Sequence, residues 1–196
     1  EVLKGRSFLA DRVGASIAPP TVTLVDDPTD GRWPSATPSD AEGLATRRNV
    51  LIDAGVVSGF VHDGYSARAL GARSTGSAVR HGFKSTPGAG TQSISLLAGD
   101  HDPASILAAV GDGIYISEVQ GLHSGVNPVS GDFSTGIEGM VIRGGELAEA
   151  VKEVTIASTL QRMMADISMV GSDLTAMPLD ATGVTLAIAD VTLSGS

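Results

Sequence analysis

The sequence predicts an α+β fold, a mainly antiparallel β-sheet with two or three packed helices, in one domain that spans residues 1–196. Three observations support this prediction. Apolar, β-branched runs alternate with turns rich in Gly, Pro and Asp, and most of them are close enough to be joined by hairpins. Few stretches have the caps or the apolar period of a helix. Hydrophobic residues make up 42% of the chain and the mean hydropathy is +0.18, which is enough for a sizeable core.

The first forty residues predict a helix, a strand and a loop. Residues Lys4 to Gly14 mix apolar and charged positions and end in glycine, as short helices often do. After two prolines, the β-branched run Thr21 to Val25 predicts a strand. The segment Asp26 to Asp40 is rich in turn formers, so it predicts a long exposed loop, and loops of that length are often functional.

The next segment predicts a hairpin, a helix and a basic loop. Asn49 to Val61, with a turn at Asp53 to Gly55, has the pattern of a β-hairpin. Tyr65 to Leu70 predicts a short helix with Ser66 as its N-cap. Arg73 to Gly90 predicts a loop that carries the densest positive cluster of the chain.

Two strands and a capped helix are predicted between residues 93 and 116. Ser93 to Leu97 and Gly113 to Ile116 are strand-like. Between them Asp102 is placed to cap a helix, because Pro103 follows at the first helical position.

The stretch Gly125 to Gly136 specifies more local shape than a generic surface loop requires. It holds turn formers, an Asn127-Pro128 bond and three glycines between two apolar runs. The alternating residues that follow predict a strand, a tight turn at Gly144-Gly145 and a second strand. This stretch is therefore expected to hold side chains or a bound group in a defined position.

The remaining residues predict a helix and closing strands. Ser158 is expected to cap a helix in which apolar residues recur at the amphipathic i, i+3, i+4, i+7 spacing. Those residues are Leu160, Met163, Met164 and Ile167. The methionine pair suits core packing better than a soft binding groove, because apolar stripes usually face the core. Val184 to Ile188 and Val191 to Leu193 predict the closing strands.

Composition excludes several classes of function. A formal charge of −9 with only 13 Lys and Arg argues against direct contact with nucleic acid, which needs clustered cations. No apolar run approaches the ~20 residues of a membrane span, and the first residues do not begin a signal peptide, so we expect no membrane contact and a cytoplasmic protein. Because cysteine is absent, disulfides, thiolate metal ligands and a cysteine nucleophile are excluded.

Several ordered segments resemble one protein family. The segments are Lys4 to Ser7, Leu24 to Pro28, Glu42 to Arg48, His62 to Arg68, Ser74 to Arg80, Asn127 to Gly136 and Val154 to Ala157. Their order and spacing resemble the C-terminal domain of the TldD/PmbA family, whose members are also called proposed modulators of DNA gyrase. In this family an N-terminal α/β domain precedes the region, and the chain starts at Glu1 without an initiator Met. We therefore expect a fragment.

The resemblance also bears on metal chemistry. Catalytic members have a His-Glu-x-x-x-His motif before this region and a cysteine in a turn that would fall within Leu179 to Gly183, where this sequence has no cysteine. That absence resembles the PmbA (TldE) branch, whose members lack the metal site and pair with a catalytic TldD subunit. The resemblance implies no cofactor in this chain, zinc on a TldD-like partner, a peptide or unfolded-protein substrate, and a homo- or hetero-oligomer.

Two other function classes stay open. Gly64 to Arg68 lies between a predicted strand and helix, as a serine nucleophile elbow does, with His62 available as base for Ser66, but Arg68 replaces the closing glycine. A non-enzymatic protein-binding modulator is the other class. Arg47-Arg48 and the Arg73 to Lys84 cluster suit an acidic partner surface or a peptide carboxylate, and equally a solvated face.

The four histidines show no spacing typical of metal ligands, although His62-Asp63 follows a predicted strand, where sites commonly occur. A peptide is expected to bind by adding a strand to an exposed sheet edge. The candidate substrate or interface positions are His62, Asp63, Tyr65, Arg68, Arg80, Asn127, Asp132 and Phe133.

Overall fold

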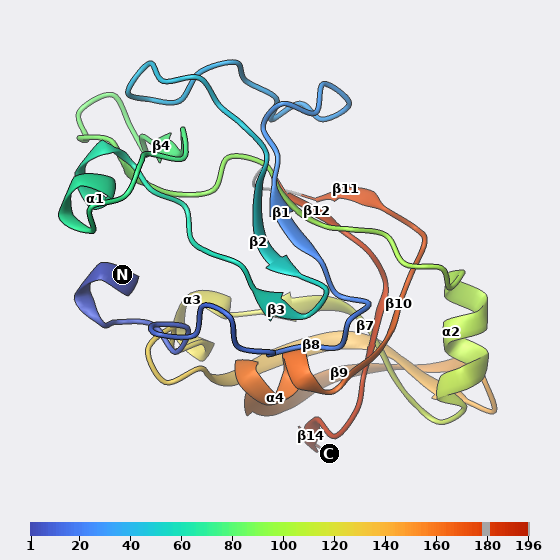
Figure 1. The fold of residues 1–196 in the computed structure, drawn as a ribbon. Helices are drawn as coiled ribbons and strands as arrows, with labels where there is room; N and C mark the ends of the chain where they lie inside the picture. Colours follow the sequence, from blue (N-terminus) through green and yellow to red (C-terminus); the bar gives the residue numbers. More distant parts are fainter. Residues whose placement is uncertain (178–180, 196) are drawn as a thin grey trace.

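The computed structural model describes residues 1–177 and 181–195, which form two sheets in different parts of the molecule (Figure 1). The upper sheet has six strands in the order β11-β12-β6-β1-β2-β3. Their bounds are β1 Leu24–Asp26, β2 Asn49–Asp53, β3 Val56–Val57, β6 Ile94–Leu96, β11 Thr175–Met177 and β12 Ala181–Gly183. β12 runs parallel to β6, and the other strand pairs in the described residues are antiparallel.

The lower sheet has four strands in the order β14-β9-β8-β7 and is built around one long hairpin. Its strands are β7 Gly113–Gln120, β8 Asp132–Arg143, β9 Glu146–Thr159 and β14 Thr192–Ser194. The tight turn at Gly144-Gly145 joins β8 to β9, and both glycines have positive φ, which only glycine adopts readily.

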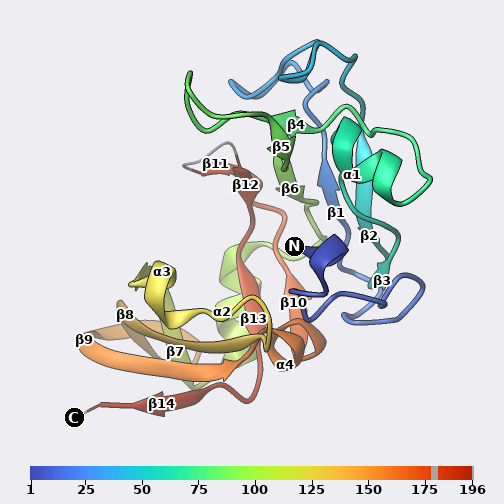
Figure 2. The same ribbon diagram turned by 90° about the vertical axis from the view of Figure 1, so that its left-hand side faces the viewer.

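Two short sheets complete the β structure. β10 (Ile167–Val170) pairs with β13 (Leu186–Ile188), and these strands run between the two larger sheets (Figure 2). β4 (Ala78–Val79) pairs with β5 (Gly88–Ala89) and forms the base of a hairpin whose tip is residues 80–87.

The described residues contain four α-helices and one turn of 3₁₀ helix. The α-helices are α1 Gly64–Ala69, α2 Pro103–Val110, α3 Leu122–Gly125 and α4 Leu160–Ala165, and the 3₁₀ turn η1 is Val2–Lys4. α2 packs against β9 and β13, α3 against β8, and α4 against β9. No helix among the described residues is long and apolar enough to cross a lipid bilayer.

Two hydrophobic clusters meet at α4. One has Ala18, Val22, Ile167 and Val170 at its centre, and the other has Phe133, Ile137 and Ile156. The adjacent residues Met163 and Met164 contact different clusters, Met163 the second and Met164 the first. The predicted core role of the methionine pair is confirmed, and this short helix connects the two cores.

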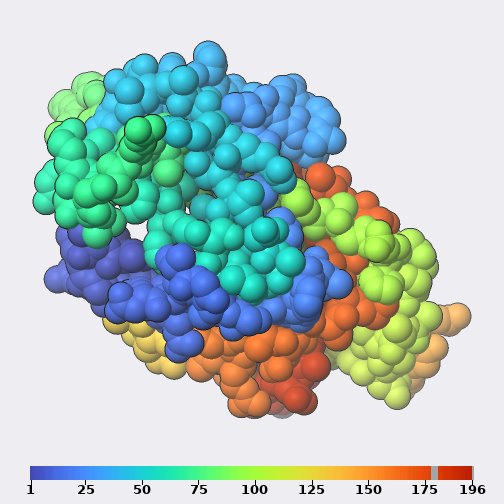
Figure 3. Space-filling view, viewed as in Figure 1, coloured from blue at the N-terminus to red at the C-terminus, as the bar shows by residue number. Residues whose placement is uncertain are grey.

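The N-terminal segment lies between the two parts of the molecule, as Figure 3 shows. Ser16 bridges to Val56, and the amides of Gly14 and Ile17 donate to the carbonyls of Val57 and Gly55. A side chain at Gly55 would collide with the Ala18 carbonyl, so this turn requires glycine. The segment therefore covers the β3 edge of the upper sheet.

The predicted α+β class with mainly antiparallel sheet is confirmed, with four α-helices where two or three were expected. The hairpins at Gly55 and Gly144-Gly145, helices α1 and α2, the long loop after β1, and the strands β1, β6, β7, β13 and β14 all lie where the sequence predicted them. Asp102 caps α2 by accepting the Ser105 amide at 3.0 Å.

Two helix predictions are wrong in extent. The expected helix at Lys4 to Gly14 is only η1, because Gly5 takes a left-handed conformation and Phe8 donates its amide to Pro128 of a distant loop. The helix expected to reach Ile167 ends at Ala165, because Ile167 pairs with Ile188 in β10 and β13. Its N-cap is Thr159, where Ser158 was expected.

Some strands were not predicted. β4 and β5 lie inside the segment expected to be a loop, and β11 and β12 follow α4 without a sequence signal. These strands are two or three residues long, and their partners are set by contacts far along the chain, as when β12 pairs with β6.

Candidate functional site

The first group of predicted site residues surrounds the start of α1. Asp63 is 5% exposed and caps the helix, because its Oδ1 accepts the Ser66 amide at 2.8 Å and the Ser66 hydroxyl. The sequence had suggested Ser66 as the N-cap of this helix, and that prediction is wrong because the N-cap is Asp63. Burial raises the pKa of the Asp63 carboxyl, but the hydrogen bonds from Ser66 outweigh it and hold that pKa below its usual value.

His62 is held through its backbone. Its amide donates to Thr75 Oγ1 at 2.7 Å, and its carbonyl accepts the Thr75 amide at 3.0 Å. Within the described residues no hydrogen bond joins His62 to Ser66, whose hydroxyl donates to Asp63. The hypothesis of a serine hydrolase acting through Ser66 and His62 gains no support from this geometry.

Glu42 belongs to the same group, although sequence reasoning gave it no role. Its Oε2 accepts the Gly64 amide at 2.8 Å, at the start of α1. A side chain at Gly64 would lie 2.9 Å from Glu42 Oε2 and 3.3 Å from Arg68 Nη1, so both charged groups flank this glycine. Nothing local reveals the contact, because Glu42 and Gly64 are 22 residues apart. Tyr65 and Arg68 are exposed beside it.

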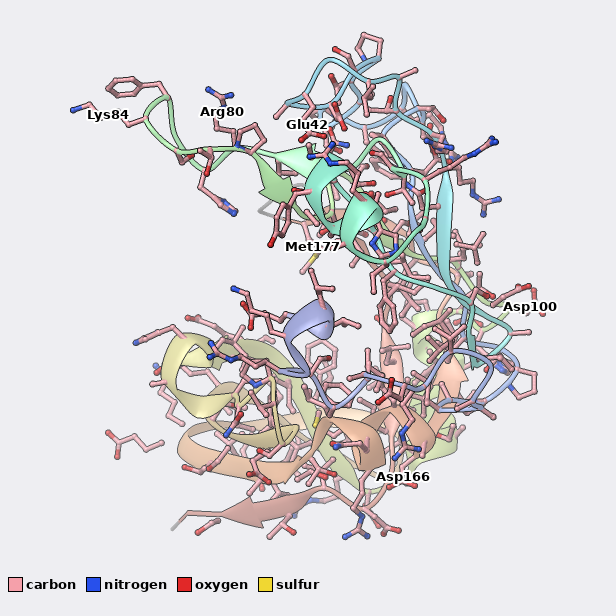
Figure 4. All side chains as sticks on the ribbon, turned by 60° about the vertical axis from the view of Figure 1, so that its left-hand side comes forward. Glu42, Arg80, Lys84, Asp100, Asp166 and Met177 are labelled. Atoms are coloured by element: carbon pink, nitrogen blue, oxygen red, sulfur yellow. The ribbon has the colours of Figure 1, made fainter. Side chains whose placement is uncertain are left out.

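Arg80 lies on the hairpin between β4 and β5, and Figure 4 shows Arg80 and Lys84 extending away from the rest of the molecule. At the tip, Phe83 is 86% exposed and the Lys84 ammonium lies 5.4 Å from its ring centre. The base of this hairpin is held in place, because Asp40 Oδ2 accepts the Ala78 amide at 3.1 Å. We call residues 80–87 the basic arm.

The second group lies in the loop before β8. Asn127 Oδ1 accepts the amides of Val129 at 2.9 Å and Ser130 at 3.3 Å, which closes a tight turn. Ser130 Oγ donates to Asp132 Oδ2 at 2.6 Å. Phe133 is buried in the lower core, so its side chain holds the loop in place and is not presented to solvent.

The structure does not bring the two groups together. His62, Asp63, Tyr65, Arg68 and Arg80 belong to the part that contains the upper sheet. The loop with Asn127, Asp132 and Phe133 belongs to the lower sheet, and η1 lies between α1 and α3 (Figures 1 and 4).

The residues present do not by themselves fit a zinc site. Nowhere in residues 1–177 and 181–195 do three His, Cys, Asp or Glu residues gather as metal ligands would. His123 lies in α3, and His62, His81 and His101 lie in three separate connecting segments. Of the stretch Leu179 to Gly183, the first two residues lie outside the described residues, and Ala181 to Gly183 form β12.

The structure also contains two cavities. The larger, about 400 Å³, lies between the N-terminal segment and α4. It is lined by Phe8, Leu9, Arg12, Ser16, Ile17, Ala18, Pro19, Gln161, Met164 and Ala165. The smaller, about 260 Å³, lies beside β1 and the long loop that follows it.

Known proteins are similar to this chain in sequence and in fold. Residues 1–195 match the family model described as the PmbA/TldA metallopeptidase C-terminal domain. The metalloprotease PmbA of Escherichia coli O157:H7 is 34% identical over 173 residues, which are 88% of this chain and 36% of that protein. This chain thus spans little more than a third of that relative's length.

Two solved structures are similar throughout. A proposed modulator of a DNA gyrase from Thermotoga maritima superposes with a TM-score of 0.90 at 27% identity, over 98% of this chain and 44% of that one. TldE from Thermococcus kodakarensis gives a TM-score of 0.86 at 32% identity, over 95% of this chain and 42% of that one. The chain therefore belongs to the PmbA/TldD metallopeptidase family, and its residues 1–195 correspond to the C-terminal domain.

Proposed function

We propose that this chain acts as a PmbA/TldE-like subunit of a TldD/TldE-type metallopeptidase complex and is itself non-catalytic. The observation that carries the proposal is β12. The family resemblance places a metal-binding cysteine within Leu179 to Gly183, and the described part of this stretch, Ala181 to Gly183, forms β12, where the Thr182 hydroxyl donates to Ser95 of β6 and both side chains are buried. The residue is thus committed to sheet packing, and threonine is not a typical zinc ligand.

In this proposal the partner supplies the metal and the water-activating glutamate, and this chain supplies structure. The residues around α1 and the loop at Asn127 to Asp132 are the proposed substrate or interface positions. Both are held by several hydrogen bonds, as a surface must be if it is to position a peptide. No direct contact with nucleic acid is proposed, because the chain carries a net charge of −9.

The edge of β7 is the proposed place for peptide strand addition. β7 has eight residues, is the outer strand of the lower sheet, and is exposed from Tyr115 to Gln120. An unpaired edge offers backbone N–H and C=O groups to any extended peptide, with little demand on its sequence. The other outer strands of the two larger sheets are shorter, since β11 and β14 have three residues each and β3 has two.

The test compares peptide hydrolysis by the protein in its natural length, alone and mixed with a TldD-type partner, beside its metal content. We expect no stoichiometric zinc in the protein alone, turnover only when the partner is present, and loss of turnover with a chelator. Stoichiometric zinc together with partner-free turnover would overturn the proposal.

A second candidate is a protein-binding modulator without turnover, as the name of the Thermotoga maritima protein suggests. The basic arm favours a protein interaction, because the Phe83 ring is 86% exposed with the Lys84 ammonium 5.4 Å from its centre, and exposed aromatic side chains often anchor interfaces. A stable complex with a client protein, and no hydrolysis with any TldD-type partner, would support this candidate over the first.

A further inference from the structure

The smaller cavity is lined by charged, aromatic and apolar side chains. Its lining is Val25, Asp27, Asp30, Arg32, Trp33, Arg48, Ser93, Ser95, Leu97 and Leu174. These residues come from β1, the loop that follows it, the residue before β2, β6 with its flanking residues, and the segment before β11. None of them belongs to the groups around α1 or Asn127.

Arg48 and Asp27 form a long ion pair in the lining of this cavity. Arg48 Nε lies 3.5 Å from Asp27 Oδ2, which is longer than a strong ionic hydrogen bond of about 2.7–2.9 Å. The side chains are 49% and 22% exposed, respectively. Asp27 Oδ1 accepts from Thr29, whereas Oδ2 faces Arg48 and accepts no hydrogen bond from the described residues. Asp27 and Arg48 thus present opposite charges side by side.

The other charged pair is already satisfied. Arg32 donates to both oxygens of Asp30, with Nε at 2.9 and 3.0 Å and Nη2 at 2.6 Å. The same guanidinium lies 5.7 Å from the ring centre of Trp33. This arrangement holds Trp33 as one wall of the cavity and leaves the recognition of charge to Asp27 and Arg48.

The floor is apolar. Val25 is buried, and Leu97 and Leu174 are half-buried. The two serine hydroxyls of the lining have protein partners, because Ser93 Oγ bonds Ser35 Oγ at 2.8 Å and Ser95 Oγ accepts from Thr182. The site therefore favours a ligand with one positive group, one negative group and an apolar side chain.

The volume of the cavity limits the size of its ligand. The cavity of about 260 Å³ is smaller than the ~300–1,000 Å³ that usually holds a drug-sized ligand. The amide backbone of a long peptide carries no adjacent opposite charges. An α-amino acid carries an ammonium and a carboxylate on one carbon, which matches the adjacent charges of Asp27 and Arg48.

We propose that this cavity binds a single apolar α-amino acid as its zwitterion. Arg48 binds the carboxylate, Asp27 binds the ammonium, and the side chain packs against Leu97, Leu174 and the Trp33 ring. The biological role of this binding rests on the proposed function, because amino acids are end products of the peptide hydrolysis that a metallopeptidase complex performs. Binding itself requires neither a partner nor turnover.

Trp33 makes the proposal directly measurable, because it is the only tryptophan in the chain. L-Leucine is titrated into the protein in its natural length while Trp33 emission is followed. A saturable change is expected. N-acetyl-L-leucine and L-leucinamide, each lacking one charge, are expected to bind about tenfold more weakly, because charged hydrogen bonds are lost.

Two variants assign the contacts. Arg48→Gln and Asp27→Asn are each expected to weaken leucine binding about tenfold, whereas the exposed controls Arg73→Gln and Asp53→Asn leave it unchanged. Circular dichroism confirms that each variant is folded. Three results would overturn the proposal: no change in Trp33 emission with L-leucine, equal binding of the two blocked derivatives, or full affinity in both cavity variants. None of these three binding results depends on peptide hydrolysis. A failure of amino-acid binding is therefore distinguishable from a failure of the metallopeptidase proposal.

Discussion

The side chain of Gln161 lies directly against Gly131. A Cβ at Gly131 would overlap Gln161 Oε1, and Gln161 Nε2 donates to the neighbouring Ser130 carbonyl at 2.8 Å. Gly131 also has a φ of 85°, which L side chains rarely adopt. Helix α4 therefore fixes the loop that precedes β8, and this loop requires glycine at its closing position.

Gly131→Ala is expected to destabilise the fold by more than the backbone strain alone, which is about 1–2 kcal/mol. Gly144→Ala is the matched control, because Gly144 also has positive φ but nothing lies within 4 Å of its Cβ position. Urea unfolding of both variants measures the difference. In a Gln161→Ala background, the excess cost at Gly131 should largely disappear. Equal costs at the two glycines would show that Gln161 does not restrict the site.

Asp26→Ala is expected to destabilise the protein by about 3 kcal/mol, since hydrogen bonds to charged groups contribute about 1.5–3 kcal/mol each. Asp26 is fully buried, and its Oδ1 accepts the amides of Gln92 and Ser93 at 2.8 Å each. Asp26→Asn keeps an acceptor oxygen and should cost less. Thermal unfolding checks the order, with exposed Asp53→Ala as the control. A loss below about 1 kcal/mol for Asp26→Ala would contradict this account.

Asp63 should make stability depend on pH in the acid range. Its folded-state pKa lies below the ordinary 3.8, so its ionised form stabilises the native state above the unfolded pKa. This stability is lost as the pH falls through the folded pKa. The difference in unfolding free energy between wild type and Asp63→Asn should therefore shrink from pH 5 downward. Asn remains a good N-cap, so the variant isolates the charge. A difference that does not change with pH would rule out this role.

The basic arm should contribute to subunit association. Phe83→Ala and Lys84→Glu are each expected to weaken binding to a TldD-type partner about tenfold, because exposed aromatic and cationic side chains are frequent anchors of interfaces. Binding is measured by titration calorimetry at low and high salt. Leu147→Ala and Lys152→Glu, at exposed positions on β9, are the controls. If the arm variants bind as tightly as wild type, the arm lies outside the interface.

Much of the fold could be predicted from local sequence. Asp102-Pro103 starts α2, and the glycines at 55 and 144–145 turn the chain between strands, because caps and positive-φ turns depend on a few adjacent residues. The long strands β8 and β9 pair with each other across one tight turn, so their pairing joins residues close in sequence. The helix predicted through Ile167 was wrong because the pairing of Ile167 with Ile188 overrides the local apolar period.

The site was predictable only in part. The start of α1 and the Asn127 turn were identified, since both depend on residues close in sequence. The contact of Glu42 with Gly64 and the cavity that places Trp33 near Arg48 were not.

By itself, then, the sequence determined the α+β class, the main turns and the family resemblance, because these follow from local backbone preferences and ordered motifs. Only the tertiary structure decided which strands pair across the chain, that α4 joins two cores, and that Asp27 faces Arg48 inside a cavity. Such contacts join residues far apart along the chain, and they form only when burial of the whole core offsets the entropy of bringing those segments together.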